Sequence, residues 1–99
     1  MINARLTSRF KKDYDKLEKR GFDMRLLDEA MDCIVQEKEL DVSFRKHALE
    51  PKNRDPKIWE LHVGGRKSDW LLLYSYLERE HENPWVIFNR TGTHSDLFD

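Results

Sequence analysis

The chain has 99 residues, of which 37% are charged and 38% are hydrophobic. This length supports one compact core, so we expect a single domain over residues 1–99. No apolar run approaches the roughly 20 residues of a membrane span, and the N-terminus lacks the apolar stretch of a signal peptide, which predicts a cytoplasmic protein without a membrane partner. One cysteine excludes an internal disulfide and a multi-cysteine zinc site.

The first 38 residues predict a short strand followed by two helices. Alternating Ile2, Ala4 and Leu6 favour a strand over residues 2–6. Thr7 or Ser8 can then cap a helix that ends at Gly21. Asp23 can cap a second helix, which we expect to end near Lys38. The apolar positions of the two helices recur at helical spacing: Phe10, Tyr14 and Leu17 in the first, and Met24, Leu27, Met31, Ile34 and Val35 in the second.

The second half of the chain predicts a loop and three strands. Residues 41–57 contain two prolines and no sustained periodicity, which is typical of a loop. Trp59, Leu61 and Val63 alternate with polar residues, and residues 70–77 are apolar on both faces, as in a central strand. Residues 85–91 form the last predicted strand. The order β-α-α-β-β-β segregates helices from strands, so we expect an α+β fold with a helical hairpin on a largely antiparallel sheet.

Formal charge is unevenly distributed, although its total is only −1. Residues 1–20 and 43–67 each carry seven basic against three acidic side chains, whereas residues 21–42 and 68–99 are acidic. Two basic blocks that fold side by side can bind phosphates whatever the total charge; a solvated mixed surface is the alternative. The basic side chains that we expect to contact nucleic-acid phosphates on this ground are Lys11, Lys12, Lys16, Arg45, Lys46, Arg66 and Lys67.

Residues near the C-terminus combine groups suited to phosphate chemistry. Arg90 can hold a phosphate through two parallel hydrogen bonds, and the imidazole of His94 can protonate a leaving oxygen. Asp69 offers a carboxylate or serves only as a turn residue, and Trp70 offers a stacking platform for a base or packs in the core. The histidine spacings match no common metal-ligand pattern, so we predict neither a metal site nor a cofactor.

Three segments together resemble the YafQ branch of the RelE/ParE toxin superfamily. They are KHAL at 46–49, DWLLLY at 69–74 and RTGTHSDLF at 90–98, and the resemblance covers nearly the whole chain. It implies a RelE-like fold and a type II toxin that cleaves messenger RNA in the ribosomal A site. It also implies a cognate antitoxin as partner, with operator DNA bound only through that antitoxin. The site residues that it implies are His47, His62, Asp69, Arg90, His94 and the terminal aromatic Phe98.

The expected chemistry is intramolecular attack of the RNA 2′-hydroxyl on the adjacent phosphodiester. Proximity supplies much of the acceleration, and each positioned acid or base adds about 10²–10⁴-fold. We assign charge stabilisation to Arg90 and general acid catalysis to His94, with His62 in a supporting role. Asp69 and His47 remain alternatives for the general base that removes the 2′ proton. The alternative is a non-catalytic binding module of the same fold, directed at gyrase or retaining only antitoxin binding.

Overall fold

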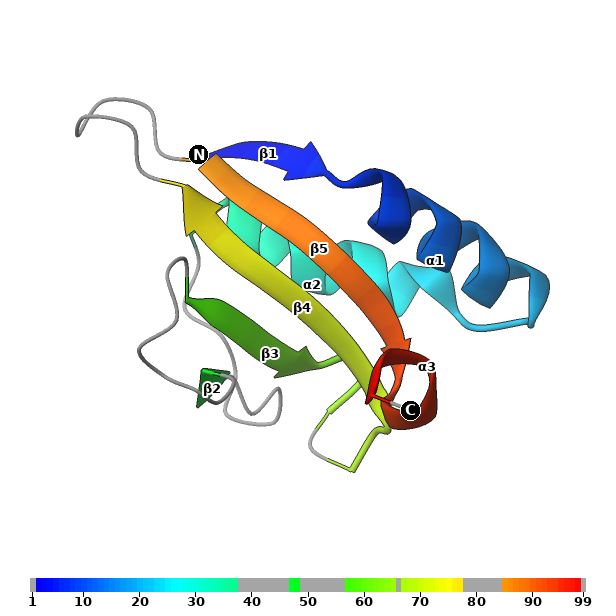
Figure 1. Ribbon diagram of the computed structural model, residues 1–99. Helices are drawn as coiled ribbons and strands as arrows, with labels where there is room; N and C mark the ends of the chain where they lie inside the picture. The colour runs from blue at the N-terminus through cyan, green and yellow to red at the C-terminus, as the bar shows by residue number, and fades with distance from the viewer. Residues whose placement is uncertain (1, 38–46, 49–56, 66, 78–84, 99) are drawn as a thin grey trace.

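The computed structural model describes residues 2–37, 47–48, 57–65, 67–77 and 85–98. The first strand and both long helices form as the sequence predicts (Figure 1). Strand β1 spans Asn3–Leu6, helix α1 spans Ser8–Lys19 and helix α2 spans Met24–Val35. Thr7 caps α1 by accepting a hydrogen bond from the Phe10 N–H at 3.0 Å. Helix α2 ends at Val35 rather than near Lys38, because Glu37 adopts a left-handed φ of 58°.

The remaining described elements are four strands and a short helix. Strand β2 is His47–Ala48, β3 is Ile58–His62, β4 is Trp70–Leu77 and β5 is Trp85–Thr93. Helix α3 spans His94–Phe98. The predicted loop 41–57 thus contains a two-residue strand, and the last strand runs two residues beyond Thr91. We did not predict α3.

The five strands form one sheet in the order β1-β5-β4-β3-β2. Every adjacent pair is antiparallel except β1 with β5, where Asn3–Leu6 run parallel to Trp85–Phe88. The expectation of an α+β fold with a helical hairpin and a largely antiparallel sheet is therefore confirmed. Between Leu73 and Tyr74 the register of β4 against β5 shifts, since Leu73 faces Arg90 whereas Tyr74 faces Phe88. Asn89 is the extra residue of this β-bulge.

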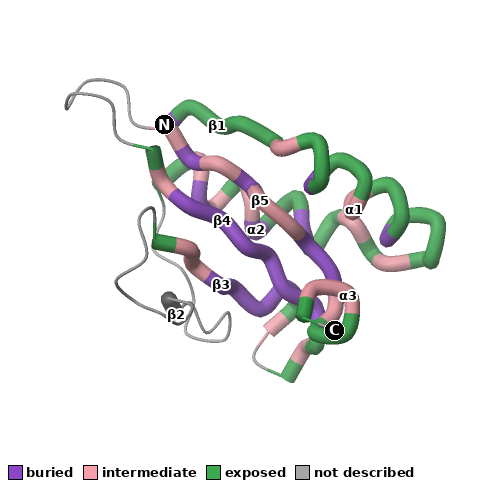
Figure 2. The backbone as a smooth tube through the Cα atoms, in the orientation of Figure 1, coloured by how far each residue is buried: buried purple, intermediate pink, exposed green. Residues whose placement is uncertain are grey.

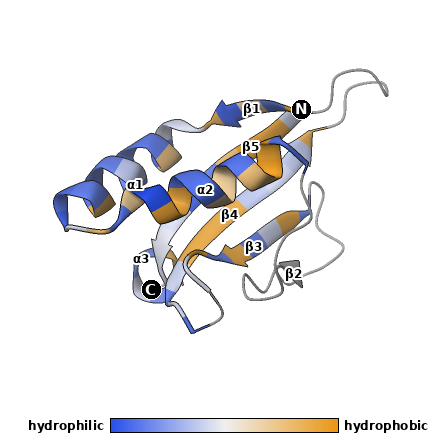
Figure 3. Cartoon of the chain, turned by 180° about the vertical axis from the view of Figure 1, so that it is seen from behind, coloured by the Kyte–Doolittle hydropathy of each residue, from blue (hydrophilic) through white to orange (hydrophobic). Residues whose placement is uncertain are grey.

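The apolar core lies between one face of the sheet and the two long helices. Figures 1 and 3 view the molecule from opposite sides, and α2 lies behind β4 and β5 in the first and in front of them in the second. Figure 2 shows buried backbone along most of β4, whose residues Trp70–Ser75 are all buried. The fully buried aromatic residues Phe10, Tyr74 and Phe88 join α1 to the two central strands. None of the described helices is both long enough and apolar enough to cross a membrane.

Candidate active site at the carboxyl end of strand β5

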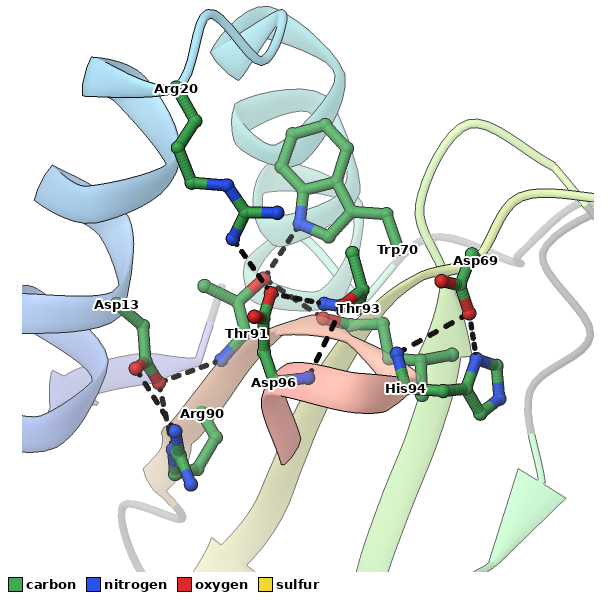
Figure 4. Close-up of polar contacts among 10 residues, drawn as sticks. Asp13, Arg20, Asp69, Trp70, Arg90, Thr91, Thr93, His94 and Asp96 are labelled. Carbon is green, nitrogen blue, oxygen red and sulfur yellow. Dashed lines mark hydrogen bonds and ion pairs between the residues drawn. The ribbon is translucent and has the colours of Figure 1, made fainter. Parts of the chain in front are cut away.

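Four of the predicted site residues gather where β5 passes into α3, beside the turn that joins β3 to β4. Thr93 at the end of β5 lies opposite Trp70 at the start of β4, so residue 94 follows at the same end of the sheet as residue 69. The rings of His62 and His94 lie 6.2 Å apart, and the ring of Phe98 lies 6.2 Å from that of His94. Figure 4 shows Asp69 pointing toward His94. Tertiary contacts thus bring together His62, Asp69, His94 and Phe98.

Asp69 and His94 form a hydrogen-bonded acid–imidazole pair. The Asp69 Oδ1 contacts the His94 Nδ1 and accepts the His94 backbone N–H at 3.3 Å. The side chains of both residues are more than half exposed. The hydrogen bond from His94 lowers the pKa of Asp69 below its ordinary value, so Asp69 is a carboxylate at neutral pH. Asp69 therefore directs the Nδ1 proton of His94 toward itself and leaves Nε2 on the far edge of the ring.

His62 is held from both sides of its ring. Its Nδ1 lies 3.0 Å from the Ser68 carbonyl oxygen, which can only accept, so Nδ1 carries a proton. Its Nε2 lies 3.5 Å from the Glu60 Oε1, and both side chains are buried. The turn at 64–68, in which Gly64 and Gly65 adopt positive φ, folds back so that Ser68 meets His62. His62 is thus a buried, oriented imidazole rather than an exposed one.

Arg90 lies earlier on β5 and is bound by a carboxylate of α1. Its Nε and Nη2 donate to the two carboxylate oxygens of Asp13 at 2.8 and 3.1 Å. These hydrogen bonds raise the pKa of Arg90 above its ordinary value, so its charge is permanent. Asp13 also accepts the Thr91 N–H at 3.2 Å. Arg90 and Thr93 are three residues apart, or about 10 Å along an extended strand, so Arg90 borders the cluster around His94.

Trp70 belongs to the core, which corrects its interpretation as a stacking platform for a base. The residue is only 6% exposed. Its indole N–H donates to the Thr91 hydroxyl at 2.9 Å, and the Phe22 ring packs edge-on against it at 5.0 Å. The strand alternation that places Leu72 and Tyr74 toward the helices places Trp70 there too. No face of the indole is left for a nucleotide.

The other predicted residues have more varied positions. His47 lies on β2, where its backbone pairs with that of Glu60. Phe98 is 52% exposed. Lys11, Lys12 and Lys16 are exposed along α1, and Lys67 is exposed in the β3–β4 turn. The predicted RNA contacts Arg45, Lys46 and Arg66 lie outside the described residues. In the part of the chain that the structure describes, no three His, Cys, Asp or Glu side chains gather closely enough to hold a metal ion.

Sequence reasoning missed the residues that hold this site. Asp13 binds Arg90, Asp96 binds both Arg20 and Thr93, and Glu60 faces His62. For Asp96 the signal was present, because Thr93-x-x-Asp96 has the spacing of a capping box at the start of a helix. For Asp13 no local signal existed, since it lies 77 residues from Arg90.

The fold and the site define a small α+β protein with a helical hairpin on a five-stranded sheet and a carboxylate–imidazole pair at the end of strand β5. Comparison with known proteins gives the family. The family model described as "Bacterial toxin of type II toxin-antitoxin system, YafQ" matches residues 2–99. The chain therefore belongs to the YafQ family of type II toxins.

Solved structures of related toxins share the fold over the whole chain. One chain of the E. coli DinJ–YafQ complex matches with a TM-score of 0.82 and 26% identity, and the match covers 100% of this chain and 100% of that chain. A copper-bound mutant toxin from Helicobacter pylori matches with a TM-score of 0.77 and 35% identity, covering 99% of this chain and 100% of that one. A metal-bound toxin from Helicobacter pylori matches with a TM-score of 0.80 and 32% identity, and the match covers 99% of this chain and 100% of that one. No curated protein sequence matches this chain.

Proposed function

We propose that this toxin is a ribosome-dependent endoribonuclease that cleaves messenger RNA in the A site and stops translation in the cytoplasm. The observation that supports it best is the hydrogen-bonded pair of Asp69 and His94 beside the buried His62. A protein that only binds a partner has no need of an imidazole whose proton is directed by a carboxylate. By the similarity to the DinJ–YafQ complex, we also propose that an antitoxin binds and neutralises this chain.

The reaction needs no external nucleophile. The 2′-hydroxyl attacks phosphorus, the bond to the 5′ oxygen breaks, and the products are a 2′,3′-cyclic phosphate and a 5′-hydroxyl. His94 in its protonated form gives the leaving oxygen a proton from Nε2, while Asp69 accepts from Nδ1 and stabilises the imidazolium. This arrangement uses the Asp69 carboxylate to orient His94, which favours His47 over Asp69 as the base that removes the 2′ proton.

Arg90 supplies positive charge to the phosphate. Its Nε and Nη2 are held by Asp13, and Nη1 is not part of that contact. A guanidinium fixed in this way costs little reorganisation when charge develops on the phosphoryl oxygens. The exposed ring of Phe98, next to His94, can stack against a base of the substrate.

Two of the helix lysines lie on the same side of α1 as the site. Lys12, Lys16 and Arg20 follow one another at intervals of four residues and share a helix face. Arg20 reaches Asp96 on α3, so this face borders the cluster. Lys11 instead lines a groove with Leu6 and Phe10, between the helices. We expect charge reversal at all three lysines to weaken ribosome binding, most at low salt, with Lys12→Glu and Lys16→Glu having larger effects than Lys11→Glu. Arg25→Glu, on the exposed surface at the start of α2, is the matched control.

The direct test is cleavage of messenger RNA on translating ribosomes by the wild type and by His94→Ala. We expect the variant to lose about 10²–10⁴-fold in cleavage rate. Ser95→Ala is the matched control, because Ser95 is the exposed neighbour on the same helix. A message with a 2′-deoxy nucleotide at the cleaved position should survive. Growth arrest without any cleavage would instead support the non-catalytic alternative, a gyrase-directed or antitoxin-binding module.

A further inference from the structure

Helix α3 begins with a reciprocal pair of hydrogen bonds between Thr93 and Asp96. The Thr93 hydroxyl accepts the Asp96 N–H at 3.2 Å, and the Asp96 Oδ2 accepts the Thr93 N–H at 2.9 Å. This is a capping box with aspartate in the third helical position. It sets where β5 stops and α3 starts. His94 is the first residue of that helix, so the same two bonds determine where its backbone lies.

Asp96 is also tied to the helical hairpin through Arg20. The Arg20 Nη1 donates to the Asp96 Oδ2 at 2.9 Å, across 76 positions of sequence. The Arg20 guanidinium lies 5.0 Å from the centre of the Phe22 ring, and Phe22 packs edge-on against Trp70. One end of the ion pair is therefore anchored on the core. The backbone N–H of Thr93 is the main cause of the lowered pKa of Asp96, and Arg20 contributes to it.

The close approach of Asp96 to β5 requires a glycine. A Cβ added at Gly92 would lie 2.8 Å from the Asp96 Cβ, which is closer than real side chains approach. This contact involves the base of the Asp96 side chain and not its flexible end, so the helix itself would have to move. Arg20, Thr93 and Asp96 meet where the strand turns into the helix (Figure 4), and Gly92 leaves the space that Asp96 needs there.

We infer that Asp96, held by Arg20, is a positioning residue that sets the place of His94 in the active site. His94 lies between two carboxylates: Asp69 binds its ring and its N–H on one side, and Asp96, two residues further on and held by Arg20, fixes its helix on the other. Asp96 touches no reacting atom in this scheme. The inference rests on the proposed function only in giving His94 a catalytic role; the positioning itself is a structural statement.

The test combines a spectroscopic signature of His94 with single-turnover cleavage on programmed ribosomes. The variants are Arg20→Ala, Arg20→Lys and Asp96→Asn, with Arg25→Ala as the matched control. Arg25 also pairs with a carboxylate, Asp23, on the exposed surface at the start of α2. We expect Arg20→Ala and Asp96→Asn to shift the His94 ring resonances and to lower the maximal cleavage rate by about 10–100-fold, the scale that a displacement near 1 Å causes.

Several further results are expected if Arg20 acts through Asp96. The half-saturating toxin concentration should stay within about 2-fold, because substrate binding is not what the pair serves. Arg20→Lys should recover most of the rate, Arg25→Ala should match the wild type, and the double variant Arg20→Ala/Asp96→Asn should be no worse than the more impaired single variant. Antitoxin binding at wild-type affinity confirms that each variant is folded.

Two outcomes would overturn the inference. One is an unchanged His94 spectrum in both Arg20→Ala and Asp96→Asn. The other is a higher half-saturating concentration with an unchanged maximal rate, which would make Arg20 a direct contact to RNA or ribosome. A failure of the proposed function looks different, because His94→Ala would then cleave as the wild type does, while the shifts of the His94 resonances in the Arg20 variant would persist.

Discussion

The two halves of strand β5 are held in different ways. Residues Trp85–Phe88 lie between β1 and β4, and Val86 and Phe88 are fully buried against the helices. Residues Arg90–Thr93 pair with β4 alone, because β1 ends opposite Phe88 and no described strand continues it. The bulge at Asn89 separates the halves. The first half belongs to the core, and the second carries Arg90 and leads into His94.

Along the outer edge of the second half, backbone N–H groups donate hydrogen bonds to carboxylates instead of to a neighbouring strand. The Thr91 N–H donates to Asp13, and the Thr93 N–H donates to Asp96. Each of these aspartates also binds an arginine, Arg90 and Arg20 respectively. Backbone donors at a sheet edge need partners, and an open edge invites pairing with another chain. Charged side chains supply these partners here, and the candidate site lies beside them.

The largest expected effect on stability is in the first half. Phe88→Ala should lower the free energy of unfolding by about 3–5 kcal/mol, because it removes a fully buried ring that packs on Phe10. His94→Ala, at the exposed residue that directly follows the other half, should change the free energy of unfolding by less than about 0.5 kcal/mol. Urea unfolding of both variants measures the difference. Similar losses in the two would contradict the division of β5 into a core half and a site half.

A smaller loss is expected when the α1 carboxylate is removed. Asp13→Ala leaves the Arg90 guanidinium and the Thr91 N–H without their partner, which should cost about 1–3 kcal/mol of unfolding free energy. Asp13→Asn keeps an oxygen acceptor and should cost less. Thermal unfolding of the two variants checks this order. If Asp13→Ala proves as stable as the wild type, the carboxylate does not hold the edge of β5.

Removing the cap of α3 should lower the free energy of unfolding by a smaller amount again. Thr93→Ala removes the hydroxyl that accepts the Asp96 N–H and should cost about 0.5–2 kcal/mol. Thr93→Ser keeps the hydroxyl and serves as the matched control. Chemical denaturation compares the two. A serine variant as unstable as the alanine variant would show that the methyl group of Thr93, and not its hydroxyl, matters.

The smallest expected effect is on how the free energy of unfolding depends on pH. The pKa of Asp96 is lowered in the folded protein, so its contribution is complete above its unfolded pKa of about 3.9 and is lost as the pH falls through the folded value. Wild type and Asp96→Asn should therefore differ in unfolding free energy near pH 7 and converge below about pH 4. Urea unfolding at a series of pH values measures this. A difference that stays constant with pH would mean that the Asp96 charge is not involved.

Sequence patterns predicted the helices and the longer strands well because their signals are local. Thr7 and Asp23 cap the two helices as expected. The first helix ends at Lys19, and Gly21, with a φ of 87°, follows its C-cap Arg20. The short strand β2 has no such signal, since two residues carry no periodicity. Helix α3 was missed because its five residues are too few to show helical spacing, although its capping box could have been read.

For the site, the chain by itself determined the chemical groups: a carboxylate, three imidazoles, a guanidinium and a terminal aromatic residue, in an order that resembles one toxin family. Only the tertiary structure decided how they are used. It buried Trp70 in the core, turned the Nδ1 of His62 toward Ser68, and placed Asp13 and Asp96 against the open edge of β5. The physical reason is that caps and periodicities act between residues a few positions apart. The partners of Arg90 and Arg20 lie 77 and 76 positions away, so packing alone brings them together.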